Sequence, residues 1–483
     1  MTRSRTSSSL ELLVELDRSG REPLHRQLEH ALRAAVRDGR LAPGSPLPST
    51  RALGRQLAIS RGIVVEAYEQ LVAEGYLASR PGGATTVARG AFAAPVARPL
   101  PPLGSFAFDF RPGRPDVTEF PRAAWLRALR RVLGNVPSDR LSYLGGRAVP
   151  ELAEALAAYL NRVRGTSAAP ADIAVANGFA QGLALALRAL RVTGARLVAV
   201  EDPSDPEYRA TIEAAGLSWV AIPVDAAGLR VDRLAATDAD VAVVTAAHQY
   251  PTGAVLRAER RQALLDWATS RGATVIEDDY DAEFRYDRQP IGALQGLAPD
   301  RVVYCGSASK ILAPGLRLGW LIVPPALSDG VIAAKQAADM GSAALDQLAF
   351  ADIVARGELD HHLRRMRPIY RARRDALLAA IGRHLPALRP AGASAGLHVL
   401  AWLPDAADEE RILADAAAVG IGIAGVASRR VAPGPPGLVF GYGAIPEASI
   451  EEGVRRLAGV IEAATPAAPG RDWVAHRRRE PEP

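Results

Sequence analysis

The stretch "YCGSASKILAPGLRLGW", Tyr304–Trp320, contains one of only two lysines in a chain of 483 residues. Lysine and arginine together number 58, so arginine supplies nearly all of the positive charge. A lysine retained in such a chain indicates a task that a guanidinium cannot perform. Because a primary amine forms a Schiff base with an aldehyde and a guanidinium does not, Lys310 is predicted to be a nucleophile.

The polar residues around Lys310 match the needs of one aldehyde cofactor, pyridoxal phosphate, which requires a carboxylate near its ring nitrogen and a site for its phosphate. The stretch "TVIEDDYDAEFRY" places Asp278 and Tyr280 directly after an apolar run. Ser307 and Arg317 flank the lysine and offer a hydroxyl and a guanidinium to a phosphate. The glycine turn at Gly178–Gln181 precedes a helical stretch whose first N–H groups favour an anion.

Each of these residues also has an ordinary structural interpretation. Asp278 would then cap a helix, Gly178 would serve a turn and Lys310 would be an exposed charge. Their joint occurrence, in this order along one chain, favours the cofactor site instead. A metal site is not expected, because the chain has a single cysteine, Cys305, and its histidines show no ligand spacing.

The part of the chain that contains these residues alternates between apolar runs rich in β-branched residues and alanine-rich helical stretches. The runs include "RLVAVED", "DVAVVTAAH", "ATVIEDD" and "RVVYCGS". Such alternation predicts an α/β fold with a mostly parallel sheet that is covered by helices on both faces. Ligands in such folds bind at the carboxyl ends of the strands, where Asp278 and Ser307 stand.

Length and composition predict two or three domains with a sizeable core, since 48% of the residues are hydrophobic. No apolar run approaches the roughly 18 residues of a membrane span, and the N-terminus lacks the pattern of a secretory signal. We therefore expect a cytoplasmic protein with no membrane partner. The first 90 residues contain 13 arginines against 9 acidic residues, a surplus that favours a nucleic-acid partner.

The N-terminal segment 23–90 has the pattern of three helices followed by a hairpin. Apolar residues recur at helical spacing after Pro23, and Ser49 and Ser60 stand where the N-caps of two further helices are expected. Two short β-rich runs follow on either side of a glycine turn. Two helices joined by a tight turn and then a hairpin predict a winged helix-turn-helix.

The stretch "GRLAPGSPLPSTRALGRQLAISRGIVVEAYEQLVAEGYL" resembles the DNA-binding domain of the GntR family. The resemblance implies that double-stranded DNA is the partner. The residues that it places against DNA are Arg51, Ser60 and Arg61, with Gly82 and Gly83 at the tip of the wing. Ile63 stands where the family usually has a threonine, so one phosphate or base contact is expected to be missing. The alternative is a helical interaction module that does not bind DNA.

The segment from Phe108 to Ala463 resembles the fold-type I, aspartate aminotransferase-like family, and more narrowly the MocR-type subgroup, in which this domain follows a GntR-type winged helix. The matching stretches include "FDFRPGRPDVTEFPRAAW", "HQYPTG" and "GSASKILAPGLRLGW". The resemblance implies that pyridoxal 5'-phosphate is the cofactor and that Lys310 is its Schiff-base lysine. The other cofactor-binding residues that it implies are Gly178, Phe179, Ala180, Asp278, Tyr280, Ser307 and Arg317, with Tyr143 contributed by the neighbouring subunit of a homodimer.

Three positions depart from the catalytic members of that family. Asp205 stands in the place of a tyrosine that stacks on the cofactor ring, and Tyr250 stands in the place of an asparagine. Val439 replaces the arginine that binds a substrate carboxylate. Arg429 and Arg430 in the preceding loop are the candidates for binding the carboxylate of an effector. A complete cofactor set with an incomplete substrate set favours a sensor over an enzyme.

The predicted chain therefore consists of a winged helix-turn-helix at 1–90 with its core at 23–90, a proline-rich linker at 91–105, an effector and dimerisation domain at 106–463, and a disordered tail at 464–483. We expect a DNA-binding transcriptional regulator that senses pyridoxal phosphate or its aldimine with an amino compound. The resemblance points to genes of vitamin B6 or amino-compound metabolism. The alternatives are a working aminotransferase with an accessory DNA-binding domain, and a dimerisation scaffold with an empty cavity.

Overall fold

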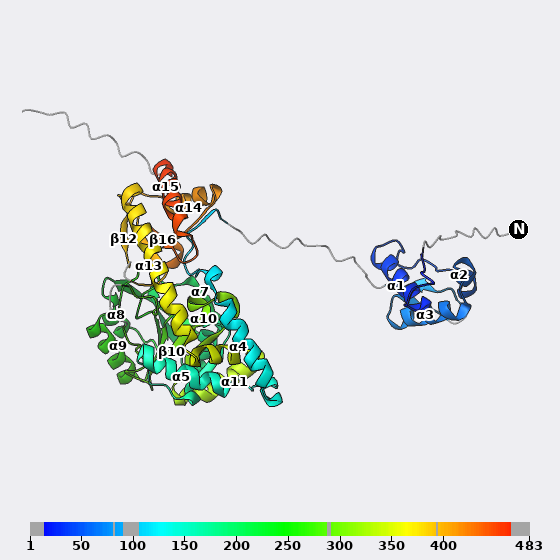
Figure 1. Ribbon diagram of the computed structural model, residues 1–483, viewed down its shortest axis with the longest axis horizontal. Helices are drawn as coiled ribbons and strands as arrows, with labels where there is room; N and C mark the ends of the chain where they lie inside the picture. The colour runs from blue at the N-terminus through cyan, green and yellow to red at the C-terminus, as the bar shows by residue number, and fades with distance from the viewer. Residues whose placement is uncertain (1–13, 81–82, 90–105, 287–290, 393–394, 465–483) are drawn as a thin grey trace, which may run out of the picture. The chain divides into compact units, whose positions relative to one another are not determined.

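The computed structural model describes residues 14–80, 83–89, 106–286, 291–392 and 395–464. The chain divides into two compact units, Met1–Leu103 and Gly104–Pro483, and Figure 1 draws both. The predicted linker, the wing residue Gly82 and the chain beyond Ala464 lie outside the described residues. Within the described ranges, no helix combines the length and the apolar character needed to cross a membrane.

The first unit contains three helices and a two-stranded antiparallel sheet, which confirms the predicted winged helix-turn-helix. Its elements are α1 (Leu24–Arg37), α2 (Thr50–Gln56), α3 (Arg61–Ala73), β1 (Leu77–Ala78) and β2 (Thr86–Val87). Ser49 and Ser60 are the N-caps of α2 and α3, and each hydroxyl accepts a hydrogen bond from the N–H three residues on. Leu28, Leu53 and Val64, one from each helix, belong to one buried core that holds the helices together.

The second unit is built around an eight-stranded sheet in the order β4-β11-β10-β9-β8-β5-β6-β7. The strands are β4 (Ile173–Ala176), β5 (Leu197–Asp202), β6 (Ser218–Asp225), β7 (Gly228–Leu229), β8 (Val241–Val244), β9 (Thr274–Asp278), β10 (Val302–Ser307) and β11 (Gly319–Ile322). The successive pairs from β10 to β6 are all parallel, whereas β11 runs antiparallel to both of its neighbours. The prediction of a mostly parallel sheet is therefore confirmed.

Helices cover both faces of this sheet, because alternate residues of each buried strand are apolar on both sides. Val200 and Val243 share a core cluster with Leu183, whereas Ala242 shares a second cluster with Leu264 on the other face. The first face is covered by α6 (Phe179–Val192), α7 (Pro206–Ala214) and α11 (Pro325–Asp339). The second is covered by α8 (Val231–Ala235) and α9 (Ala258–Arg271).

A smaller four-stranded sheet, in the order β12-β13-β16-β15, lies toward the C-terminus of the second unit. It consists of β12 (Arg389–Ala391), β13 (His398–Trp402), β15 (Ala424–Gly425) and β16 (Gly437–Gly441). In Figure 1 this sheet lies with α14 (Glu409–Ala418) and α15 (Glu447–Ala464) at one end of the unit, and the large sheet lies at the other. The long helix α13 (Glu358–His384) precedes the small sheet and packs along α15.

The remaining elements complete the second unit around the large sheet. They are α4 (Arg122–Asn135), α5 (Pro150–Arg164), α10 (Ala308–Ile311), α12 (Ala344–Ala355), the short strands β3 (Phe108–Asp109) and β14 (Ile421–Gly422), and five 3₁₀ turns, η1 (Val117–Glu119), η2 (Ser138–Leu141), η3 (Pro170–Asp172), η4 (Pro314–Leu316) and η5 (Ala427–Arg429), among the described residues. Helix α12 packs against both α4 and α5. The parallel pair β3 and β14 ties the start of the unit to the segment before β15.

The carboxyl ends of β4, β5, β8, β9 and β10 all meet at one edge of the large sheet. Four of these strands are mutually parallel, and β4 shares their direction because β11 is antiparallel to both β4 and β10. Gly178, Asp205, Asp278 and Ser307 therefore come together at this edge, although they lie far apart in the sequence. Such an edge is where ligands bind in open α/β sheets.

Candidate functional site

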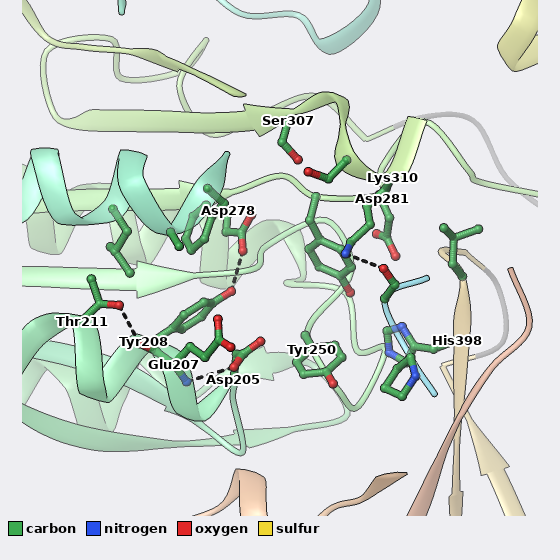
Figure 2. Close-up of a pocket in the computed structure, with 18 of the residues that line it drawn as sticks. Asp205, Glu207, Tyr208, Thr211, Tyr250, Asp278, Asp281, Ser307, Lys310 and His398 are labelled. Atoms are coloured by element: carbon green, nitrogen blue, oxygen red, sulfur yellow. Dashed lines mark hydrogen bonds between the residues drawn. The ribbon is translucent and has the colours of Figure 1, made fainter. Parts of the chain in front are cut away.

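A cavity of about 330 Å³ opens at the carboxyl edge of the large sheet. It is lined by seven of the residues predicted to bind a cofactor: Phe179, Ala180, Asp278, Tyr280, Ser307, Lys310 and Arg317. These seven are called the cofactor wall below. Tyr250 and His398 also line the cavity. Arg429 donates a hydrogen bond to the Tyr250 hydroxyl, and Val439 lies on β16, which pairs with the strand that carries His398; these four residues are called the far wall. Figure 2 shows Lys310, Tyr250 and His398 around the same space.

Lys310 lies on α10, the single turn that follows β10, and its side chain enters the cavity. Its Nζ donates a hydrogen bond of 2.7 Å to the backbone oxygen of Gly113. Burial is the largest influence on this amine and lowers its pKa, and the neighbouring Asp278 carboxyl offsets part of that change. A lowered pKa increases the fraction of neutral amine, which is the form that attacks an aldehyde.

Asp278 ends β9 and is almost completely buried at the cavity edge. Burial raises the pKa of this carboxyl to about 8, because the charged form has lost its water. The hydroxyl of Tyr208 donates to its Oδ2 at 2.5 Å. A buried carboxyl in this state gains most from a cation or a protonated ring nitrogen placed inside the cavity, and this fits the pyridine ring of pyridoxal phosphate.

The turn before α6 has the geometry of an anion site. Gly178 has φ of +92°, and a Cβ placed on it would lie 2.8 Å from Arg317 Nη2, so no other residue fits easily. Arg317 donates from the same Nη2 to the backbone oxygen of Asn177 at 2.5 Å. The first N–H groups of α6, at Phe179 and Ala180, therefore point to the cavity beside a guanidinium. This combination suits a phosphate group.

Tyr280 is fixed by a polar cluster that the sequence interpretation did not include. Its hydroxyl donates to the backbone oxygen of His248 at 2.9 Å and lies 3.1 Å from the Nδ1 of that ring. The same Nδ1 lies 3.1 Å from the Asp281 carboxylate. The His398 ring packs on His248 with its centroid 4.9 Å away, and its Nε2 lies 3.1 Å from the Pro251 oxygen. These hydrogen bonds hold the Tyr280 ring in one orientation.

The two arginines predicted to bind an effector carboxylate, Arg429 and Arg430, have different surroundings. Arg429 donates from Nε to the hydroxyl of Tyr250 at 2.9 Å, and Tyr250 lines the cavity. Arg430 instead lies over the ring of Trp402 at 5.8 Å, away from the residues that line the cavity. The structure therefore brings Arg429 next to the site and leaves Arg430 outside it.

Val439 is fully buried in a small apolar cluster with Leu400 and Val426. From β16 it pairs with Leu400 of β13 and Ala424 of β15, so the position where the family resemblance leads us to expect an arginine is packed with hydrocarbon. This packing leaves no guanidinium at position 439. Within the far wall, Val439 thus contributes hydrocarbon to a buried cluster, and Arg429 on η5 contributes a guanidinium that contacts Tyr250.

The predicted residue Tyr143 and the second lysine, Lys335, lie elsewhere. Tyr143 is 81% exposed and does not line the cavity within this chain. Lys335, the other lysine, is buried on α11, where its Nζ donates to Asp339 at 2.7 Å, Gln181 at 2.9 Å and Ser342 at 2.8 Å. Its retention has a structural explanation, because the ammonium donates to three partly buried oxygens beside the first turn of α6.

The sequence interpretation missed Tyr208, Asp281 and His398, all of which line the cavity. Tyr208 had a usable sign in the sequence, since it follows Asp205 by three residues and so shares a helix face with it. Asp281 follows Tyr280 directly and was part of a stretch already singled out. His398 had no local sign, because only the packing of β13 against the large-sheet part of the unit brings it to the cavity.

In the first unit, Arg51 and Arg61 are exposed near the starts of α2 and α3. The Nε of Arg61 donates to the Thr50 hydroxyl at 3.4 Å, which brings the starts of the two helices together. The Ser60 hydroxyl accepts from the N–H of Ile63 at 3.4 Å, so this side chain caps α3. Exposed guanidinium groups at a helix N-terminus are suited to DNA phosphates.

Comparisons with known proteins agree with this architecture. Residues 24–87 match the gntR family of bacterial regulatory proteins, and residues 115–415 match aminotransferase class I and II. A multiple substrate aminotransferase from Thermococcus profundus has a similar solved structure, with a TM-score of 0.69, 26% identity, and coverage of 75% of this chain and 93% of that protein.

Two curated relatives resemble the chain across both units. The probable rhizopine catabolism regulatory protein MocR of Rhizobium meliloti is 32% identical, with 92% of this chain and 95% of the relative covered. The pyridoxine biosynthesis transcriptional regulator PdxR of Corynebacterium glutamicum is 32% identical, with 86% and 91% covered. The chain therefore belongs to the GntR family, in the MocR-type group of DNA-binding transcriptional regulators whose winged helix-turn-helix precedes an aminotransferase-like domain.

Proposed function

We propose that this regulator binds pyridoxal 5'-phosphate covalently at Lys310 and that the state of this site controls its binding to DNA. The observation that carries the proposal is the partly buried amine of Lys310 in one cavity with the buried carboxyl of Asp278, whose pKa is raised. Withdrawing an amine and a carboxyl from water is costly unless hydrogen bonds and opposite charges compensate both groups. A ligand with an aldehyde and a protonatable ring nitrogen would satisfy both.

The cofactor wall supplies a site for each part of such a ligand. The phosphate would be bound by the N–H groups of Phe179 and Ala180 at the Gly178 turn, with Ser307 and Arg317. Asp278 would pair with the ring nitrogen, and the Tyr280 hydroxyl would approach the ring hydroxyl. When bound, pyridoxal phosphate supplies an aldehyde that exchanges one amine for another. Lys310 would hold that aldehyde until an amino compound replaces the lysine.

The signal is proposed to be pyridoxal phosphate itself or its combination with an amino compound. Arg429 is the better candidate for an effector carboxylate, because it contacts Tyr250 at the cavity, whereas Arg430 lies over Trp402. The relatives are named for pyridoxine biosynthesis and rhizopine catabolism, which supports target genes in vitamin B6 or amino-compound metabolism. The exposed Tyr143 supports a homodimer in which it reaches the neighbouring cavity.

Binding to the operator is proposed to use Arg51 and Arg61 with the start of α3, and the wing with Gly82 at its tip. Selection from a random-sequence DNA library would identify the sites bound by the full chain. Arg61→Ala should then weaken binding about tenfold and reduce the salt dependence by about one released counterion. An unchanged affinity and salt slope would count against this face of α3.

The cofactor test is direct. The purified full chain mixed with pyridoxal phosphate should show absorbance near 420 nm, and borohydride should convert the bound cofactor to a stable adduct on Lys310, found by peptide mass spectrometry. DNA binding measured with and without the cofactor should differ. Absence of the absorbance band would reject the proposal and favour a scaffold with an empty cavity.

A working aminotransferase is the second candidate, supported by the class I and II match across residues 115–415. The buried apolar surroundings of Val439 argue against it, because they leave no arginine at the usual carboxylate position. Sustained keto-acid production from an amino donor, at about 1 per second or faster, would favour the enzyme. A single slow conversion per cofactor would favour the sensor.

A further inference from the structure

Helix α7 follows Asp205, the position where the family resemblance leads us to expect an aromatic residue. Asp205 is the N-cap of this helix, and its carboxylate accepts from the N–H of Glu207 at 3.0 Å. An aspartate is among the best N-caps, so the side chain serves the helix at this position and offers no aromatic ring to the cavity. The chain has an aromatic ring three residues later, at Tyr208.

Tyr208 directs its ring to the same cavity that Asp205 lines. Residues three apart in a helix share one face, so the ring enters the cavity one turn along α7. The side chain is 7% exposed, and its ring centroid lies 5.4 Å from that of Phe179 on the cofactor wall. Figure 2 shows the ring between Asp205 and Asp278, with its hydroxyl turned to the carboxyl.

The hydroxyl of Tyr208 also fixes one oxygen of the carboxyl that the ring nitrogen would use. It donates to Asp278 Oδ2 at 2.5 Å, and among the described residues no hydrogen bond to Oδ1 is found. The hydroxyl therefore orients the carboxyl, while the second oxygen stays available to a ligand in the cavity. No residue at position 205 is needed for this arrangement.

We propose that Tyr208 replaces the missing aromatic residue at 205, with its ring contacting the pyridine ring of the cofactor and its hydroxyl orienting Asp278. The inference rests on the proposed binding of pyridoxal phosphate. It assigns to one side chain two tasks that need different atoms. The two tasks are separable, because phenylalanine keeps the ring and removes the hydroxyl, and leucine removes both.

The experiment uses the full chain and pyridoxal phosphate, with affinity measured from absorbance near 420 nm and orientation from visible circular dichroism at the same wavelength. Tyr208→Leu should weaken binding about 2- to 10-fold, the range for one aromatic contact. Tyr208→Phe should bind within about 2-fold of the original chain, since the ring contact remains. Its circular dichroism band should nevertheless change, because Asp278 has lost its hydrogen-bond donor.

An aromatic ring placed at position 205 should restore cofactor binding when the ring at position 208 is removed. Asp205→Tyr combined with Tyr208→Leu should recover most of the affinity lost by Tyr208→Leu alone. Tyr159→Phe is the matched control, because it removes a hydroxyl from another buried tyrosine, on α5, outside the cavity lining. This control should leave both affinity and circular dichroism unchanged. Thermal unfolding of each variant shows whether it is folded, and Tyr208→Phe carries the test if the leucine variants are not.

The outcomes separate the two proposals. If the unchanged chain takes up no pyridoxal phosphate, the proposed function and this inference both fail. If it takes up the cofactor and Tyr208→Leu binds equally well, only the ring contact is rejected. If Tyr208→Phe leaves the circular dichroism band unchanged, the orienting role of the hydroxyl is rejected. Weaker binding by the leucine variant together with recovery by the double variant supports the inference.

Discussion

The two walls of the cavity are built by different kinds of structure. The cofactor wall consists of polar residues at the ends of strands and the start of a helix, and each lies at a position that the sheet fixes. The far wall is formed by loops and the small sheet, where Val439 is packed in an apolar cluster and Arg429 reaches in from a 3₁₀ turn. One wall keeps the features of a cofactor site, and the other lacks the usual site for a substrate carboxylate.

Under the proposed function, binding a cofactor and turning over a substrate are separable properties of this cavity. The cofactor wall depends on strand ends, which are tied to the core of the fold. The far wall depends on loops and on the small sheet, which are separate from the large sheet. A regulator can therefore keep the first wall as a sensor while its second wall is adapted to an effector.

The largest expected effect is at Lys310. Lys310→Arg keeps a positive charge but removes the nucleophilic amine, so borohydride should trap no pyridoxal phosphate on the protein. Lys335→Arg is the control, because Lys335 is engaged with Asp339 away from the cavity lining, and its trapping should be unchanged. Mass spectrometry of the reduced protein measures both. A normal yield of adduct in Lys310→Arg would place the covalent site elsewhere.

The second effect tests how completely the far wall has become apolar. Val439→Arg places a guanidinium in a fully buried cluster and should lower the free energy of unfolding by about 2–4 kcal/mol. Val419→Arg, at a half-exposed position, should change it by less than about 0.5 kcal/mol. Chemical denaturation gives both values. A stable Val439→Arg variant that binds amino acids more tightly would show that the wall still has room for a carboxylate.

The third prediction concerns how the buried carboxyl of Asp278 affects the stability of the cofactor-free protein. The pKa of Asp278 is raised to about 8 in the folded state, so the folded protein holds a proton that the unfolded chain releases near pH 4. The stability of the cofactor-free protein should therefore fall as the pH rises from about 4 to 8. Asparagine has no titratable carboxyl, so Asp278→Asn should remove this fall in stability with rising pH.

The variant, freed of cofactor, should exceed the original chain in stability by about 1–3 kcal/mol at pH 8, with the difference shrinking toward about pH 5. Thermal unfolding across this range measures the effect. The same variant should bind pyridoxal phosphate more weakly, because the ring nitrogen has lost its charged partner. A stability difference that does not vary with pH would show that Asp278 is ionised in the folded protein.

The smallest effect separates the two arginines of the far wall. With pyridoxal phosphate bound, titration with L-alanine should shift the absorbance near 420 nm. Arg429→Ala should weaken the response about 5-fold, as expected for the loss of one charge-assisted hydrogen bond. Arg430→Ala is the matched control and should change it by less than about 2-fold, since its guanidinium lies over Trp402. If Arg429→Ala and Arg430→Ala weaken the response equally, Arg429 has no special role in binding the carboxylate.

The sequence indicated which residues meet at the cavity because these residues stand beside strongly patterned elements. Asp278 and Ser307 end apolar strands, and Gly178 precedes a long helical stretch, so parallel strand direction alone brings them to one edge. The caps Ser49 and Ser60 were predicted for the same reason, since a cap is a local arrangement. Local patterns were enough for both units of the fold.

The tertiary structure alone decided the contacts between distant segments. The hydrogen bond from Tyr208 to Asp278 joins residues 70 positions apart, and the one from Arg429 to Tyr250 joins residues 179 apart. The burial of Val439 depends on Leu400 of a neighbouring strand. No periodicity or spacing encodes such pairs, because they arise where separately formed elements pack together. The sequence thus determined which groups stand at the strand ends, and packing determined which of them meet.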